Sequence, residues 1–220
     1  MKTLVFDTCF NKSYIVLREN GNIISSDIIE STDKNYHSAY LIPKIRDILK
    51  ENNLLIKDLD AIGVNIGPGS FTGIRAGITI ARVLCQQADI KLVGISSLEI
   101  LSKLNNSDMK TIVTLDARKN KVYYAEYLNN KAIIEPSLIE KDELLNNIDS
   151  HYIVIADKSI TDYLTEQGIE ALNFEKNDSK IGLFLSDIVY MRLESAQEDY
   201  NWAKVKPLYI QQPSITVKTA

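Results

Sequence analysis

The chain is poor in the residues that build metal centres and disulfide frameworks. Its 220 residues include two cysteines and two histidines. Cys9 and Cys85 are isolated in the sequence, which excludes a disulfide framework and a metal knuckle. Neither His37 nor His151 has a second histidine at helical spacing, so a metalloprotease motif is excluded too. We expect His37 to be a polar contact at the start of a helix.

The sequence also lacks a long apolar run and an excess of positive charge. No run approaches the length that spans a membrane, and the first apolar run, ended by Asp7, is too short for a signal peptide. The net charge of -4 is a poor basis for gripping nucleic acid alone. The content of 45% hydrophobic and 25% charged residues is typical of a globular protein. We therefore expect a cytoplasmic protein without a membrane partner.

The most informative stretch is a glycine-rich loop between an apolar strand, Ala61 to Ile66, and a helix, Ala76 to Cys85. Its residues are Gly67, Pro68, Gly69, Ser70, Phe71, Thr72, Gly73, Ile74 and Arg75. The glycines allow a sharp turn and a close approach of other backbone. Ser70 or Thr72 can cap the helix, whose free N–H groups then form an anion site. A tight strand-to-helix turn without a ligand is the alternative.

The helix after this loop is apolar on nearly every side. Ile74, Ile78, Ala81 and Cys85 lie on one side, and Gly77, Ile80 and Leu84 lie on others. Such a helix must be covered on more than one face. Gly73 and Gly77 would let another backbone come close.

The remaining pattern predicts strands and helices in an order that occurs twice. The first round has strands at Lys2–Asp7, Ser13–Arg18 and Asn22–Ile29, a helix at Tyr36–Glu51, the strand and helix around the glycine loop, a strand at Leu92–Ile95 and a helix at Ser96–Leu104. The second has strands at Thr111–Asp116, Val122–Leu128 and Lys131–Glu135, a helix at Lys141–Ile148, a strand at His151–Ala156, and helices at Ser159–Gln167 and Ile181–Leu193. Asn20-Gly21 predicts a tight hairpin turn.

Each round opens with a strand that ends on an acid, Asp7 in the first and Asp116 in the second. The periodic pattern is interrupted between Leu104 and Lys110, which places a boundary between halves 1–105 and 106–220. The tail from Lys206 onward contains Pro207 and Pro213 and is expected to be extended, free to pack back on the first half.

Three familiar phosphate or nucleophile motifs do not fit the glycine loop. A dinucleotide site needs an acid at the end of the next strand, which instead ends in Gly94-Ile95-Ser96. A Walker loop needs a lysine after Gly73, where the chain has Ile74. A nucleophile elbow needs glycines two residues before and two residues after Ser70, where the chain has Pro68 and Thr72.

Several stretches together resemble one family. They are Asp7-Thr8 with Ser13, His37-Ser38 with Leu41-Ile42-Pro43, Gly67 to Arg75, Gly94 to Leu101, and Leu115-Asp116-Ala117-Arg118. This set looks like the TsaB family, also called YeaZ, which is a subunit of the bacterial machinery that makes threonylcarbamoyladenosine in tRNA. The resemblance covers most of the first half and the start of the second, and it is weak after Ala132.

The resemblance implies an α/β protein of the actin-like, Hsp70-like ATPase (ASKHA) fold. This fold has two ribonuclease-H-like halves, each with a mixed sheet and flanking helices. It also implies a chain without catalytic residues, because the relative TsaD carries the active site and the ATP. Where TsaD has a pair of metal-binding histidines, alignment places Ser97 and Leu101, which are not ligands for iron or zinc. Asp7 and Asp116 would be vestiges of phosphate-loop acids.

The family further implies partners and a surface for them. The helices Tyr36–Glu51 and Phe71–Gln87 would form a helix-bundle interface with TsaD, and the same face would serve a homodimer when TsaD is absent. The interface residues expected are Tyr36, Ala39, Tyr40, Pro43, Ile74, Gly77, Ile80, Ala81 and Leu84. TsaE is a further partner, tRNA is reached only through the complex, and no cofactor is expected apart from room for an adenine nucleotide at a complex interface.

Two departures from the family pattern bear on these expectations. Cys9 stands where the family usually has serine, and Gln211 stands where it often has arginine. They weaken the case for a nucleotide contact by the first loop and for an anion contact by the tail. The competing class is an enzyme of the same fold, either a nucleotide-binding ATPase or a peptidase-like protein.

Overall fold

The computed structural model describes residues 1–30, 36–195 and 199–211, with the side chains of 36–39 left out of the description. Its first sheet has five strands in the order β3-β2-β1-β4-β5. They are β1 (Lys2–Asp7), β2 (Ser13–Glu19), β3 (Asn22–Ile29), β4 (Ala61–Asn65) and β5 (Lys91–Ile95). β2 is antiparallel to both of its neighbours, whereas β1, β4 and β5 are parallel. The sheet is therefore mixed.

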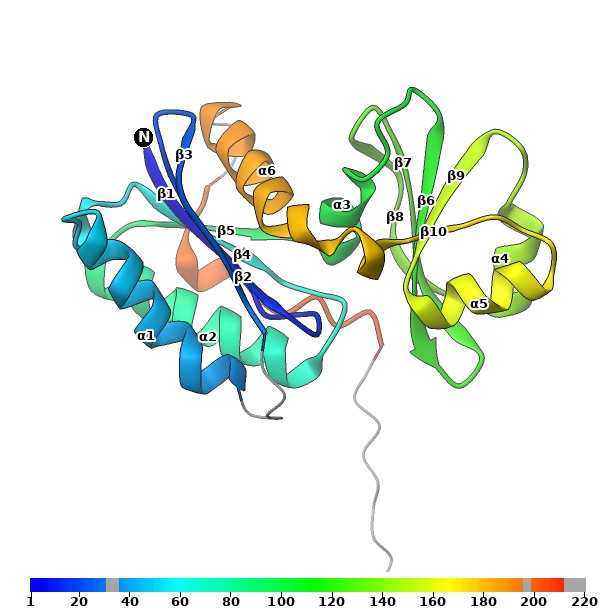
Figure 1. Cartoon of the computed structure of the whole chain (residues 1–220), viewed down its shortest axis with the longest axis horizontal. Helices are drawn as coiled ribbons and strands as arrows, with labels where there is room; N and C mark the ends of the chain where they lie inside the picture. Colours follow the sequence, from blue (N-terminus) through cyan, green and yellow to red (C-terminus); the bar gives the residue numbers. More distant parts are fainter. Residues whose placement is uncertain (31–35, 196–198, 212–220) are drawn as a thin grey trace, which may run out of the picture.

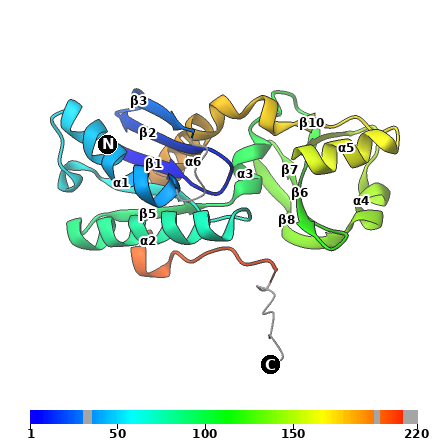
Figure 2. The ribbon, with the colours of Figure 1, turned by 60° about the horizontal axis from the view of Figure 1, so that its bottom comes forward.

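Helices cover both faces of this sheet. α1 (Tyr36–Glu51) and α2 (Phe71–Ala88) lie side by side on one face, and α6 (Ile181–Ser195) lies across the other (Figures 1 and 2). The strands between them are almost wholly buried, as expected for a sheet packed on two sides. No helix within the described residues has the length and apolar character that a membrane span needs.

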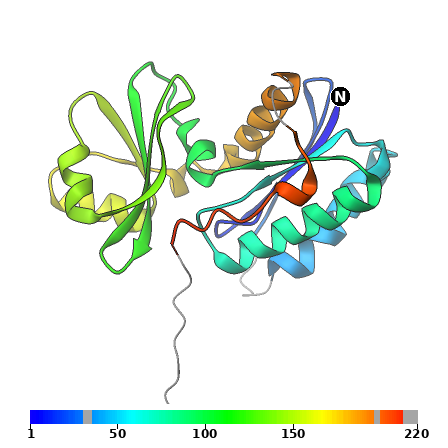
Figure 3. The same ribbon diagram turned by 180° about the vertical axis from the view of Figure 1, so that it is seen from behind.

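The second sheet has the same strand order, β10-β9-β6-β7-β8. Its strands are β6 (Lys110–Arg118), β7 (Lys121–Leu128), β8 (Lys131–Glu140), β9 (Tyr152–Ala156) and β10 (Leu172–Asn173). α4 (Lys141–Asn147) and α5 (Lys158–Glu166) pack on it, and α3 (Ser97–Ser102) contacts β6, β7 and α6 (Figure 3). Short 3-10 turns complete the chain at η1 (Ile56–Asp58), η2 (Phe174–Lys176), η3 (Asp178–Lys180) and η4 (Trp202–Lys204). β1 and β6 occupy the same central position in their sheets, so Asp7, the last residue of β1, and Asp116, near the end of β6, lie on equivalent strands.

The structure confirms the expected element order and shows three differences in detail. α2 begins at Phe71, as expected for the interface helix, and not at Ala76, where the apolar pattern begins, because the Ser70 hydroxyl caps it and lets the first turn form inside the glycine loop. β10 was not predicted, since two residues give no periodic signal. β8 continues five residues beyond the expected Glu135 to Glu140.

The strands of the first sheet fall within residues 1–105 and those of the second within 106–220. α6 nevertheless crosses back, and its buried side, including Ile181, Leu185 and Val189, packs on β1, β2 and β4. The placing of the domain boundary at 105/106 stays a prediction.

Candidate functional site

The glycine loop is held at both ends by side chains. The N–H of Gly67 donates to Oδ1 of Asn65 over 2.8 Å, and the Gly67–Pro68 peptide bond is cis. At the other end, the N–H of Gly73 donates to Oγ of Ser70 over 3.2 Å. The N–H of Ser70 is itself used by the carbonyl oxygen of Cys9, at 2.8 Å. The backbone N–H groups of Gly67, Ser70 and Gly73 therefore all donate to acceptors within the chain itself.

The close approach expected at the glycines takes place against the turn that follows β1. A Cβ added to Gly73 would lie 1.7 Å from the carbonyl oxygen of Thr8, and one added to Gly69 would lie 2.5 Å from that of Cys9. Both distances are too short for any side chain. The Thr8 hydroxyl donates to the carbonyl oxygen of Gly73 over 2.7 Å. The glycines thus allow the first loop of the chain to rest directly on the start of α2.

A buried polar network lies behind the loop. Oδ1 of Asp7 accepts from the N–H of Cys9 at 2.7 Å, and Oδ2 accepts from the Asn65 amide at 2.8 Å. The Ser97 hydroxyl donates to the other end of Asn65, at 2.9 Å. All three side chains are fully buried. Burial raises the pKa of Asp7 from 3.8 to about 6, against the opposing effect of its hydrogen bonds to Asn65 and Cys9.

This network decides what Asp7 can do. Both of its carboxylate oxygens are occupied by neighbours, and none of its surface reaches solvent. Ser97 and Leu101, at the positions aligned with metal ligands, are buried as well. Within the described residues, no cluster of three or more His, Cys, Asp or Glu side chains has a geometry suited to a metal ion.

Asp116, at the end of the equivalent strand, has a different setting. Its carboxylate lines a cavity of about 740 Å³ between the two halves, and it lies 3.8 Å from the Lys141 ammonium. The backbone N–H of Asp116 donates to Asp157 over 2.6 Å, and Asp157 also caps α5. Of the two acids expected as vestiges of phosphate loops, only Asp116 faces open space.

The cavity mixes cations, acids and aromatic rings drawn from both halves. Its lining residues are Cys9, Phe10, Asn11, Lys12, Tyr14, Gly69, Ser70, Phe71, Thr72, Leu115, Asp116, Ala117, Arg118, Lys119, Tyr123, Asp157, Phe174, Glu175, Asp178 and Gln211. Lys12 is paired with Glu30 at 2.9 Å and with Asp178 at 2.8 Å. Burial raises the pKa of the Cys9 thiol well above its usual range, which makes it a poor nucleophile. The described lining contains no histidine to act as a base near neutral pH.

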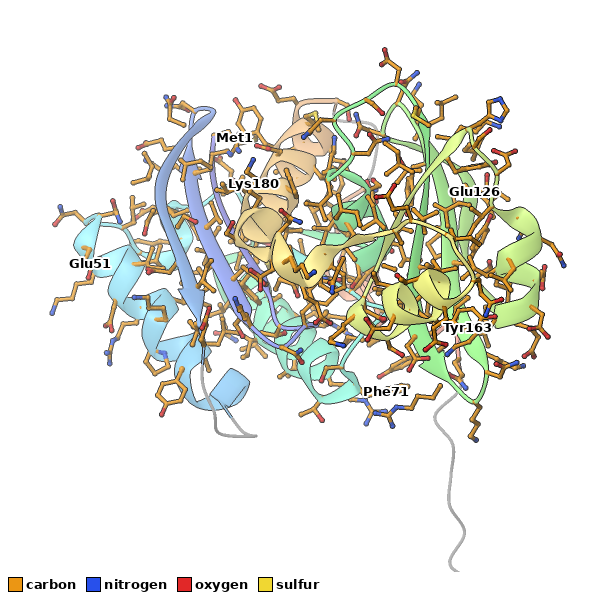
Figure 4. The ribbon with its side chains drawn as sticks, turned by 45° about the vertical axis from the view of Figure 1, so that its right-hand side comes forward. Met1, Glu51, Phe71, Glu126, Tyr163 and Lys180 are labelled. Atoms are coloured by element: carbon orange, nitrogen blue, oxygen red, sulfur yellow. The ribbon has the colours of Figure 1, made fainter. Side chains whose placement is uncertain are left out.

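The C-terminal tail packs back on the first half, over the glycine loop, through partners that the sequence did not indicate. The N–H of Leu208 donates to the carbonyl oxygen of Ile66 at 2.9 Å. The ring of Tyr209 stacks on Phe71 at 5.8 Å, and its hydroxyl accepts from Nε of Arg75 at 2.8 Å. Phe71 marks the N-terminal end of α2 in Figure 4. The tail therefore fixes the orientation of Arg75, and no local signal links these residues across 134 positions.

The structure divides the residues expected at a partner interface into two groups. Tyr40 is 49% exposed, Pro43 is exposed, and Ile80 and Leu84 are half-buried, so these side chains can meet a partner. Ile74 and Ala81 are 2% and 0% exposed, and Gly77 is buried, because this side of α2 packs on β4 and the Thr8 turn. Their assignment to an interface is wrong. The side chains of Tyr36 and Ala39 lie outside the described residues.

A surface stripe on α2 was predicted only in part, since Phe71 and Arg75 were expected as contacts of the glycine loop and Thr79 and Val83 were not expected at any site. Phe71, Arg75, Thr79 and Val83 recur every four residues and are all exposed, Val83 to 50%. This spacing places them on one outer face of the helix. The sequence contains the signal, but helical spacing alone does not tell which apolar side faces the chain's own core.

Two five-stranded sheets of identical strand order, each beginning with an antiparallel hairpin, define the duplicated ribonuclease-H-like architecture of the ASKHA fold. YeaZ from Pseudomonas aeruginosa shares the fold, with a TM-score of 0.75 and 18% identity over 94% of this chain and 100% of that one. A family model described as TsaD, tRNA N6-adenosine threonylcarbamoyltransferase, matches residues 24–183. The chain belongs to the TsaB family, because a curated TsaB protein is 31% identical to it over 68% of that protein's length.

Relatives in that family support the assignment by sequence. The tRNA threonylcarbamoyladenosine biosynthesis protein TsaB of Escherichia coli (strain K12) is 27% identical over 154 residues, which are 64% of this chain and 65% of that protein. TsaB of Buchnera aphidicola subsp. Acyrthosiphon pisum is 31% identical over 155 residues, covering 66% of this chain and 68% of that protein. The chain thus spans about two thirds of the length of these relatives.

Proposed function

We propose that the chain is a non-catalytic scaffold and activator subunit in threonylcarbamoyl transfer to tRNA. It would act with TsaD and TsaE, and the modified base would be the adenosine next to the anticodon of tRNAs that decode ANN codons. Membership of the TsaB family supports the pathway. The buried Asp7–Asn65–Ser97 network is the observation that carries the non-catalytic role.

The network supports this role because of where it stands in the fold. An acid after the first strand that binds phosphate through a metal must present a free oxygen to the space between the halves. Here both oxygens of Asp7 are taken up by Asn65 and by the Cys9 N–H. Ser97 is held by the same asparagine and is not a metal ligand. The positions that would do chemistry have become part of the core.

The outer face of α1 and α2 is the surface we assign to TsaD. The helices α1 and α2 are neighbours (Figure 2). Each carries large exposed apolar side chains, namely Tyr40 and Ile42 on α1 and Phe71 and Val83 on α2. Exposed apolar side chains on adjacent helices are typical of a helix-bundle contact. In the absence of TsaD, the same face would pair two copies of this chain.

Cofactor and location follow from the same proposal. The chain alone would bind no cofactor, and any adenine nucleotide would lie at an interface of the complex, where a partner supplies further contacts. The tRNA would be reached through the complex, which agrees with the net charge of -4. The complex would work in the cytoplasm.

Reconstitution tests the proposal. Purified chain is combined with TsaD and TsaE of the same organism, ATP, threonylcarbamoyl-adenylate and an ANN-decoding tRNA, and the modified nucleoside is measured by mass spectrometry. We expect modification only when the chain is present, and no ATP or peptide hydrolysis by the chain alone. Hydrolysis by the purified chain would favour the competing enzyme class, and full modification without the chain would remove the activator role.

A further inference from the structure

A second cavity, of about 420 Å³, lies between α3, α6 and the β7–β8 hairpin. It is separate from the central cavity, because the two share no lining residue. In Figure 1 these elements meet where α3 stands between α6 and the second sheet. A volume of this size falls in the range of sites for small molecules.

Among the charged groups that line this cavity, Lys103 is half-buried without a direct partner in the described residues, whereas Lys131 and Glu135 are exposed. Lys103, the residue that ends α3, forms no hydrogen bond or ion pair with any described residue. It is half-buried, and this burial lowers the pKa of its ammonium, although the charges of Asp187 and Glu99 oppose the effect. A partly desolvated ammonium without a hydrogen-bond acceptor is energetically unfavourable, and an anion in the cavity would relieve that cost.

The two acids whose charges act on Lys103 are already paired, and Glu135, the other acid in the lining, is exposed. Both oxygens of Glu99 accept from Nη2 of Arg192, at 2.8 and 2.7 Å. Asp187 is paired with Arg18 on the other side of α6. The half-buried Lys103 ammonium therefore stays available to an anion, while the ion pair between Glu99 and Arg192 is already complete.

Beside these polar groups the wall carries an apolar patch, which is drawn from both halves. Ile188 and Met191 come from α6, and Ala132 and Pro136 come from β8. The pairing of β7 with β8 is irregular on both sides of Glu126, which places extra β8 residues beside this wall. Bulges of this kind often lie next to binding sites, where they redirect side chains.

We infer that this cavity binds a small organic acid, with its carboxylate on Lys103 and a branched apolar group against Met191, Ile188 and Pro136. The apolar patch favours a carboxylate that carries a hydrocarbon group over a bare inorganic anion. Because α6 packs on the first sheet and β8 belongs to the second, the bound acid would also join the two halves.

Methyl NMR of the full chain tests this site. The chain has three methionines, Met1, Met109 and Met191, so selective methyl labelling gives one reporter in the cavity and two internal controls. The probes are 4-methylvalerate, its neutral amide and inorganic phosphate. We expect 4-methylvalerate to shift the Met191 signal with a dissociation constant on the order of 1 mM, and the amide and phosphate to bind about tenfold more weakly or not at all.

Variants identify the anchoring group. Lys103→Gln should weaken 4-methylvalerate about tenfold, Lys103→Arg should retain most of the binding, and the exposed control Lys57→Gln should bind as the unmodified chain does. No shift of Met191, or equal binding by the Lys103→Gln variant, would overturn the site. Phosphate binding as tight as that of the organic acid would overturn the ligand class.

Discussion

Replacing Gly73 with alanine tests the close contact on which the glycine loop depends. The added Cβ would lie 1.7 Å from the Thr8 carbonyl oxygen, which belongs to backbone and not to a flexible side chain. Either α2 or the Thr8 turn must move, and overpacking of this kind costs about 3 kcal/mol or more. The higher helix propensity of alanine than of glycine offsets about 1 kcal/mol of this cost. The net loss is therefore about 2 kcal/mol or more, which for a chain of this size lowers Tm by about 4–8 °C.

Thr8→Val is the matched control for this prediction. It keeps the shape of the contact and removes only the hydrogen bond from the Thr8 hydroxyl to the Gly73 carbonyl oxygen. That loss is about 1 kcal/mol, and hence about 2–4 °C. Thermal melts followed by circular dichroism give both values. A Gly73→Ala variant that melts at or above the temperature of the unmodified chain would show that the loop and the turn are not in contact.

Three further predictions concern the buried network, the tail and the metal content. The pKa of Asp7 is raised to about 6, so the stability given by its neutral form is complete below about pH 4 and is lost as the pH rises through 6. This loss in the free energy of unfolding amounts to roughly 3 kcal/mol by pH 7, and urea unfolding of Asp7→Asn should not show it. Equal pH profiles of the variant and the unmodified chain would refute the prediction. Arg75→Ala removes an exposed contact to Tyr209 and should change Tm by no more than about 4 °C. The same variant should impair assembly with TsaD, and unimpaired assembly would contradict the role of Arg75. Elemental analysis of chelator-free protein should find no stoichiometric iron or zinc, and one tightly held metal per chain would overturn the non-catalytic role.

Much of the fold could be predicted because its signals are local. The apolar spacing of α1 gave both of its ends, and Asn20-Gly21 forms the tight hairpin turn, with positive φ at both residues. The apolar pattern alone placed the start of α2 late, at Ala76, because the cap, Ser70, lies inside a loop whose glycines resemble a turn. The packing of α6 on the first sheet has no local signal, since it depends on contacts with strands more than a hundred residues away.

The site was predictable in its residues and not in its contacts. The glycine loop was identified from its composition, and the structure shows what approaches it, the Thr8 and Cys9 carbonyl groups. Asn65 was missed because a polar residue at the end of an apolar strand has no distinctive pattern, although it links Asp7 to Ser97. The buried side of α2 was assigned to a partner because helical spacing does not distinguish an internal core from an external one.

Binding of TsaD to variants of the α2 face tests the central claim most directly. Val83→Asp places a carboxylate on the exposed stripe, and Ile133→Asp places one on β8 at a side chain of equal exposure, 49% against 50%. Both variants should remain folded, and isothermal titration with TsaD of the same organism gives the dissociation constants. We expect Val83→Asp to weaken binding by about 2 kcal/mol, close to thirtyfold, and Ile133→Asp to leave it unchanged. Equal affinity of the two variants would contradict the assignment of this face to the partner.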